Sequence, residues 1–273
     1  MSDNFPELSE AAAPPDVAAV YAEIRTLSGV PMVALIFRHL ATLDGVLQEV
    51  WQAIGPLLRA GLVQDRAWRV ARAEGSALEL PAVEVHARAA IGLDGAQLDR
   101  LHAILDAYNR ANPVNLLCML CLLRRLNDGA PPAPLPAKGR WSPPAPIAAL
   151  PPMVAIDAMA PEVRWLLNDF GLGDRSRLDP VVPSLFRHLA EARPLLAILH
   201  VLLAERFRDG SIERVMGNID RAMQAEAERL ARYLPPLELV AAEPGVRDVL
   251  RRFTAGLIPQ MIVIGFALRR SFS

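Results

Sequence analysis

An internal repeat constrains this sequence more than any other feature. The segment Phe37-Arg38-His39-Leu40-Ala41 returns unchanged as Phe186-Arg187-His188-Leu189-Ala190. Identities continue at the same spacing, as in the pairs Val33 and Val182, Arg59 and Arg208, and Gly61 and Gly210. A second block, residues 108–125, has a counterpart in residues 253–270. Each copy is far longer than a solenoid unit, so we expect a duplicated unit packed about a pseudo-two-fold axis. A site at that axis would begin symmetric and could specialise on one side.

Apolar residues recur at helical spacing. Residues 16–27 and 96–107 both place apolar side chains three or four positions apart, which predicts amphipathic helices, and no stretch alternates as a strand would. We expect Pro31 and Pro180 in the first turns of corresponding helices, and Gly61 and Gly210 where corresponding helices end. The predicted fold class is therefore all-α, with two tandem helical repeats that form a pseudo-two-fold dimer.

A segment rich in proline and alanine separates the repeats. Residues 128–152 read DGAPPAPLPAKGRWSPPAPIAALPP, a composition that favours extended backbone over helix or sheet. The sequence therefore predicts helical repeat one at residues 1–127, a linker at residues 128–152 and helical repeat two at residues 153–273.

Composition narrows the classes of function. The 273 residues are 52% hydrophobic and 22% charged, which suffices for a substantial core, and the net charge of −1 provides no basic stripe for nucleic acid. The start lacks the charged and apolar regions of a signal peptide, and the most apolar run, residues 257–268, is too short to span a membrane. We expect a cytoplasmic protein with no nucleic acid or membrane partner. The sequence leaves open whether the protein forms a homo-oligomer.

Two stretches carry a resemblance to a known family. Residues 20–45 (VYAEIRTLSGVPMVALIFRHLATLDG), residues 107–117 (AYNRANPVNLL) and the two-repeat plan resemble the group I 2-haloacid dehalogenases. The resemblance covers most of the chain and is most specific in repeat one. It implies an all-α pseudo-dimer that removes halide from both enantiomers of short 2-haloacids without a metal or an organic cofactor. It also implies that an aspartate activates water for direct attack on the halogen-bearing carbon, with no covalent ester.

The resemblance also assigns site residues. Asn112 and Ser184 keep the polar residues of the family, whereas the position of the water-activating aspartate is occupied by Leu185, whose mate in repeat one is Ile36. An aliphatic side chain cannot accept a proton. Aliphatic residues also replace family aromatics and a tyrosine, so the predicted substrate-binding residues are mostly apolar: Asn112, Ser184, Leu185, Met32, Leu35 and Leu250.

Two functions follow from this pocket. The first is a 2-haloacid dehalogenase-like hydrolase. A positioned acid or base contributes about 10²- to 10⁴-fold, so with Leu185 we expect little or no hydrolysis of 2-chloropropionate. The alternative is a non-catalytic binder of a small carboxylic acid more apolar than haloacetate, or a structural relic with a closed pocket. A ligand-sized cavity with Asn112 at its wall would favour a hydrolase or binder, whereas a packed centre would favour the relic.

Some residues allow both a chemical and a structural interpretation. His188, one helical turn beyond Leu185, and its mate His39 could each activate water or simply lie on the flank of an amphipathic helix. Asp179 before Pro180, and Asn112 before Pro113, could cap helices. The pair Cys118 and Cys121 has redox spacing, but its apolar surroundings favour core packing.

Overall fold

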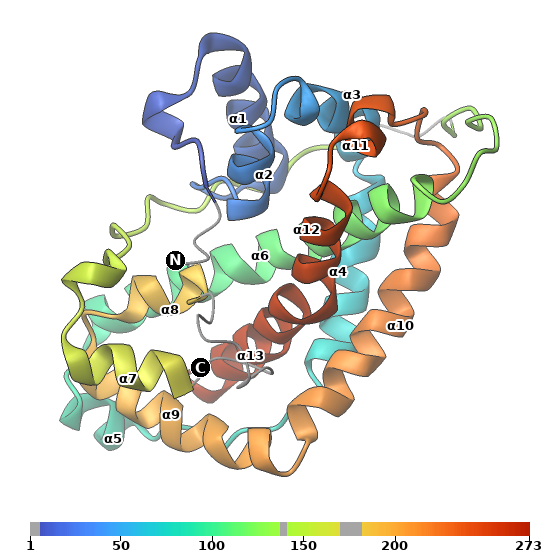
Figure 1. Ribbon diagram of the computed structural model, residues 1–273. Coiled ribbons are helices and arrows are strands. Elements are labelled where there is room, and N and C mark those ends of the chain that lie inside the picture. Colours follow the sequence, from blue (N-terminus) through green and yellow to red (C-terminus); the bar gives the residue numbers. More distant parts are fainter. Residues whose placement is uncertain (1–5, 137–140, 170–181) are drawn as a thin grey trace.

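The described part of the chain is built from helices alone. The structure, a computed structural model, describes residues 6–136, 141–169 and 182–273, and within these ranges it contains no strand (Figure 1). The all-α prediction is confirmed. Pro180 and Asp179, for which helix-start roles were predicted, lie outside the described residues.

Two groups of helices follow the two halves of the sequence. The first half contains η1 (Glu10–Ala12), α1 (Pro15–Ser28), α2 (Leu35–Leu40), α3 (Val46–Arg59), α4 (Leu62–Gly75), α5 (Val85–Ala90) and α6 (Gly95–Arg125). The second half contains η2 (Ile156–Ala158), α7 (Pro161–Asp169), α8 (Ser184–Leu189), α9 (Arg193–Arg208), α10 (Ser211–Ala231), α11 (Glu238–Ala242), α12 (Val246–Arg252), the π-helical turn η3 (Phe253–Leu257) and α13 (Ile258–Ser271).

Corresponding helices begin at corresponding positions of the two repeats. Helices α2 and α8 start at matching positions, and so do α4 and α10. Gly61 and Gly210 stand immediately before α4 and α10 with φ of 65° and 71°, so the backbone at both positions passes through the left-handed region that glycine adopts without strain. Phe37 and Phe186 are both buried. These features support the predicted duplication, while the pseudo-two-fold axis itself stays a prediction.

The long helix α6 departs from expectation. It runs for 31 residues through Pro113, so Asn112 lies in a helix interior and the prediction that it caps a helix is wrong. The cap is Asp94, whose carboxylate accepts a hydrogen bond from the Gln97 N–H at 3.0 Å. A proline inside a helix removes one hydrogen bond, but residues 116–122 are all buried, and their packing outweighs that loss. Pro31 likewise precedes α2 in an irregular turn instead of lying in its first turn.

The core is shared by both halves. Helices α6 and α13 pack side by side at the centre, with α4 and α10 against them (Figure 1). One hydrophobic cluster contains buried side chains from both repeats.

The helix Val246–Ser271 is long and apolar enough to cross a membrane by length and composition, but 61% of its most apolar window is buried inside the protein, as a core helix would be. The boundaries predicted at 127 and 152 stay predictions.

The described part of the linker packs on repeat one through Trp141. Residues 128–136 and 141–152 contain neither helix nor strand. Within this segment the Trp141 indole lies directly over Gly61, so that a methyl group on Gly61 would clash with the ring.

This contact predicts different costs for two equivalent substitutions. Gly210→Ala places a side chain at φ 71° with Arg214 Nη1 as its nearest neighbour at 3.8 Å, so only backbone strain of about 1–2 kcal/mol is expected. Gly61→Ala carries the same strain plus the clash with Trp141, which adds about 1–3 kcal/mol. Urea unfolding of the two variants measures the difference. Equal losses of stability would contradict the packing of Trp141 on Gly61.

Candidate functional site

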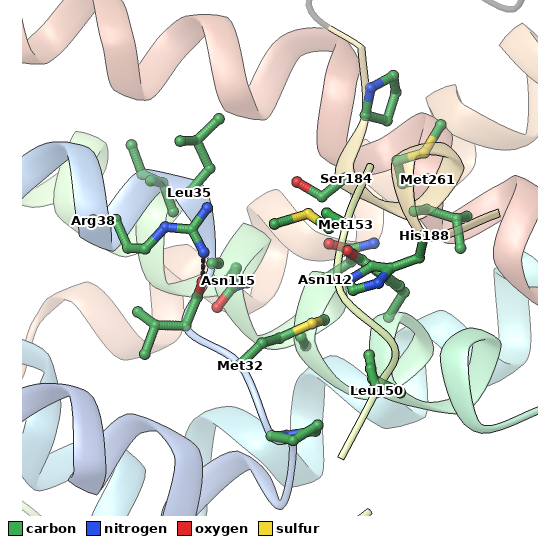
Figure 2. A pocket seen from close by; sticks show the side chains of 18 of the residues that line it. Met32, Leu35, Arg38, Asn112, Asn115, Leu150, Met153, Ser184, His188 and Met261 are labelled. Atoms are coloured by element: carbon green, nitrogen blue, oxygen red, sulfur yellow. Dashed lines mark hydrogen bonds between the residues drawn. The ribbon is translucent and has the colours of Figure 1, made fainter. Parts of the chain in front are cut away.

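A cavity of about 330 Å³ opens where the two repeats meet (Figure 2). Its walls come from the start of α2, the middle of α6, residues 149–153, the start of α8, and η3 with α13. Residues 33–36 and 182–185, which are equivalent in the repeat, face the same cavity, and so do Tyr108 and Phe253. The centre of the molecule is therefore not packed solid, which is the outcome that favours a hydrolase or a binder over a relic.

Five of the six predicted site residues line the cavity: Met32, Leu35, Asn112, Ser184 and Leu185. Leu250 does not line it. It lies fully buried in α12, and Phe253, one helical turn further along, forms that part of the wall. The lining is mainly aliphatic, as expected from the residues that replace the family aromatics.

The proline-rich linker forms one wall, which the sequence interpretation missed. Residues 149–153 line the cavity. Backbone and side-chain hydrogen bonds fasten this segment on both sides. The Ile147 N–H donates to the Gly29 carbonyl at 3.0 Å, Arg110 Nη1 donates to the Ala145 carbonyl at 2.7 Å, and the Val154 N–H donates to the Arg187 carbonyl at 3.2 Å. The segment is thus part of the site as well as a connection between repeats.

Asn112 lines the cavity and carries a hydrogen-bond donor, the buried Nδ2, that has no partner among the described residues. Nearby, the Ser184 side chain hydrogen-bonds with the Tyr108 hydroxyl, and burial raises the pKa of Tyr108 far above its ordinary value, so this phenol stays neutral. A buried amide without a partner costs about 1–3 kcal/mol, so a ligand oxygen that accepts from Asn112 would recover that energy.

His188 also faces the cavity, with its ring edge-on to Tyr108 at a centroid distance of 5.8 Å. Burial lowers the pKa of His188 below its usual value, a hydrogen bond with the backbone of Pro151 opposes this, and the charges of Arg187 and Arg38 lower it further. Its Nδ1 is buried without a partner among the described residues. The imidazole is therefore neutral at pH 7.

The equivalent histidine of repeat one has another role. His39 does not line the cavity, and its Nδ1 hydrogen-bonds with the Pro6 carbonyl oxygen at 2.8 Å. Identical local sequences thus place one histidine in a structural contact and the other at the site. The site is asymmetric despite the repeat.

Two charged side chains reach the cavity wall from repeat one. Arg38 donates to the Val33 carbonyl at 2.8 Å and pairs with Glu7. Glu10 accepts from the Val33 N–H at 3.1 Å and pairs with Arg25, and it is the one carboxylate among the described lining residues. Both charged residues of the wall thus have partners of opposite charge.

The cysteine pair is part of the core. Cys118 and Cys121 are both buried in α6, and burial raises the pKa of the Cys118 thiol to about 12 and that of Cys121 well above its usual value. Thiols in this state are inert, so core packing is the supported interpretation. Within the described ranges, no group of three or more His, Cys, Asp or Glu side chains is arranged to hold a metal ion.

Of the comparisons with known proteins, the one with solved structures supports the fold. No protein-family model matches the chain. No curated protein matches its sequence. Two solved structures, a D-2-haloacid dehalogenase mutant in complex with D-2-CPA and a D-2-haloacid dehalogenase with L-LA, each align with a TM-score of 0.72 over 100% of this chain and 96% of theirs. The identity is 16% in both, so this likeness concerns the fold. The chain has a haloacid dehalogenase-like all-α fold.

Proposed function

We propose that this protein binds a small carboxylic acid with an aliphatic tail in the central cavity. The observation that carries the proposal is the free amide donor of Asn112 in a cavity of about 330 Å³ with mostly aliphatic walls. Small-molecule sites have this composition, namely an apolar lining with a few polar groups that fix orientation.

The lining also suggests the shape of the acid. Met32, Leu35 and Leu185 supply apolar surface, and each CH₂ group buried against such surface contributes about 0.8 kcal/mol. A branched acid of four to six carbons therefore suits the cavity better than a haloacetate. Its carboxylate would accept from Asn112 while its tail contacts the aliphatic wall.

Hydrolysis of a carbon–halogen bond is the second candidate function. It is favoured by the fold shared with D-2-haloacid dehalogenase structures and, more specifically, by the group I resemblance of residues 20–45 and 107–117. On this proposal the chain is a divergent group I member that needs neither a metal nor an organic cofactor. We further propose that it acts in the cytoplasm on a small carboxylic or halocarboxylic acid, without a nucleic acid or membrane partner.

A thermal-shift screen tests the binding proposal. Wild-type protein should be stabilised by 2-methylbutanoate and related acids, because a ligand that binds only the folded state contributes about 2.7 kcal/mol at a concentration of 100 times its Kd. Asn112→Ala should weaken binding roughly 10- to 100-fold, since a hydrogen bond to a charged group contributes about 1.5–3 kcal/mol.

Asn109→Ala is the matched control for this variant. Asn109 lies on the same helix but outside the cavity, where its Nδ2 donates to the Gly265 carbonyl at 3.1 Å. Its substitution should lower stability without changing the shift that acids cause. If no acid stabilises the wild-type protein, or if Asn112→Ala retains the full shift, the binding proposal fails.

A further inference from the structure

A second cavity, of about 440 Å³, lies between the end of α6, the middle of α10 and the junction of α12 with η3. Both α10 and α12 pack against α6 (Figure 1). Among the described residues, this cavity shares no lining side chain with the central cavity. Most of its lining is polar, and this polar cleft is defined by Arg124, Asn127, Asp220, Gln224, Arg251 and Thr254. Its chemistry therefore differs from that of the mainly aliphatic central cavity.

The equivalent place in repeat one holds an ion pair. At the spacing of the second repeated block, Arg124 corresponds to Arg269. At the same spacing, Arg251 corresponds to Asp106. Arg269 Nε donates to the Asp106 carboxylate at 3.0 Å, and this bond joins α13 to α6. Repeat two has an arginine in place of that carboxylate, so two guanidinium groups line one cleft.

The same comparison explains why the polar cleft is open. In repeat one the Asn109 amide donates to the Gly265 carbonyl at 3.1 Å, and a side chain at position 265 would collide with Asn109. Repeat two has Leu120 at the position of Gly265. It has Thr254 at the position of Asn109, and the Thr254 hydroxyl donates to the Leu250 carbonyl of the preceding turn at 2.9 Å. The contact that fills this place in repeat one is thus replaced, and space remains beside α6.

Both arginines of the polar cleft keep donors for a ligand. Arg124 pairs with Glu228 at 2.9 Å, and Arg251 pairs with Asp248 at 3.4 Å. Neither carboxylate lines the cleft, and each pair is a single hydrogen bond, whereas a guanidinium carries five N–H donors. All four side chains are more than half exposed, and such ion pairs contribute little to stability. A ligand carboxylate can therefore bind both guanidinium groups.

One carboxylate, Asp220, is among the described residues that line the polar cleft. It accepts a long hydrogen bond of 3.5 Å from Gln224 Nε2, and no ion pair joins it to Arg124 or Arg251 within the described ranges. The cleft thus offers two positive groups and one negative group. A ligand of complementary charge has two carboxylates and one ammonium group.

We propose that the polar cleft binds a small acidic amino acid, such as aspartate. The ligand carboxylates accept hydrogen bonds from Arg124 and Arg251, which match them in shape as well as in charge. The ligand ammonium group donates to Asp220. One ligand carboxylate thereby has the role that Asp106 has in repeat one. This site is additional to the proposed acid site in the central cavity and does not depend on it.

Isothermal titration calorimetry with L-aspartate tests the proposal. The wild-type protein should bind L-aspartate, with succinate as the comparison because it has both carboxylates but no ammonium group. Succinate should bind about 10- to 100-fold more weakly, since a hydrogen bond between charged groups contributes a factor of this size. Asp220→Asn should remove most of this preference, because the negative charge that attracts the ammonium group is lost.

Arg251→Asp tests the site most sharply, because it recreates the ion pair of repeat one. The new carboxylate can pair with Arg124, as Asp106 pairs with Arg269, so the variant should fold while its affinity for L-aspartate falls about 100-fold or more. Arg214→Asp is the matched control, since it makes the same charge change at an exposed position outside the cleft. Its affinity should equal that of the wild type. Circular dichroism shows that each variant is folded.

Asn112→Ala, in the central cavity, separates the two sites and should bind L-aspartate as the wild type does. The proposal is wrong if the wild-type protein gives no binding heat with L-aspartate at several temperatures, or if it binds succinate equally well. It is also wrong if folded Arg251→Asp keeps the wild-type affinity. Loss of L-aspartate binding in Asn112→Ala would place this ligand in the central cavity and would contradict the proposal as well.

Discussion

An aspartate at position 185 should bring halide release to this protein. Leu185→Asp is expected to raise the kcat/KM for 2-bromobutanoate above that of the wild type by about 10²- to 10⁴-fold. The side chain of residue 185 lines the cavity, where its carboxylate would accept a proton from water. Bromide release measured above pH 7 reports the effect.

Leu185→Asn is the matched control. Asparagine has the shape of aspartate but cannot accept a proton from water, so the activity of this variant should stay at the level of the wild type. Leu185 is fully buried, so both variants should lose about 2–5 kcal/mol of stability, and assays belong at low temperature. Equal activity of the Asp and Asn variants would show that position 185 does not contact the reacting water.

Phe186→Ala and Phe37→Ala should each lower the free energy of unfolding by about 3–5 kcal/mol. Both rings are buried at equivalent positions of the repeat and belong to one hydrophobic cluster, and Phe37 also packs edge-on against Trp51 at a centroid distance of 6.5 Å. Removal of either ring leaves a cavity in the core that both halves share. Guanidinium unfolding monitored by circular dichroism measures the loss.

Trp165→Ala provides the comparison for these two variants. The Trp165 side chain is 63% exposed, so its loss should change stability by less than about 1 kcal/mol. A loss below about 1 kcal/mol for either phenylalanine variant would show that the two repeats do not bury these positions equivalently.

Local features explain why much of the fold could be predicted from the sequence. Gly61 and Gly210 mark helix boundaries because only glycine adopts their positive φ without strain, and this property needs no knowledge of the rest of the chain. Helical periodicity identified α1 in the same way. The prediction failed at Pro113, where tertiary packing of α6 overrides a local signal.

The site residues were harder to predict from the sequence, because contacts between residues distant in sequence determine which side chains line the cavity. Residues 149–153 have no periodicity that indicates which atoms they touch, so their part in the cavity wall could not be foreseen. Leu250 lies one helical turn before Phe253, the residue that lines the cavity, and is itself buried. His39 and His188 share the same neighbours in sequence, yet only His188 faces the cavity, since its partner Pro151 comes from the linker.

Isothermal titration calorimetry of 2-methylbutanoate into the wild-type protein tests the central claim most directly, namely that the cavity binds a small aliphatic acid. Binding should occur with one site per chain, and its enthalpy should become more negative with rising temperature, because burial of apolar surface gives a negative heat-capacity change. The same titration with Asn112→Ala should show roughly 10- to 100-fold weaker binding. The absence of any binding heat for the wild-type protein at several temperatures would contradict the claim.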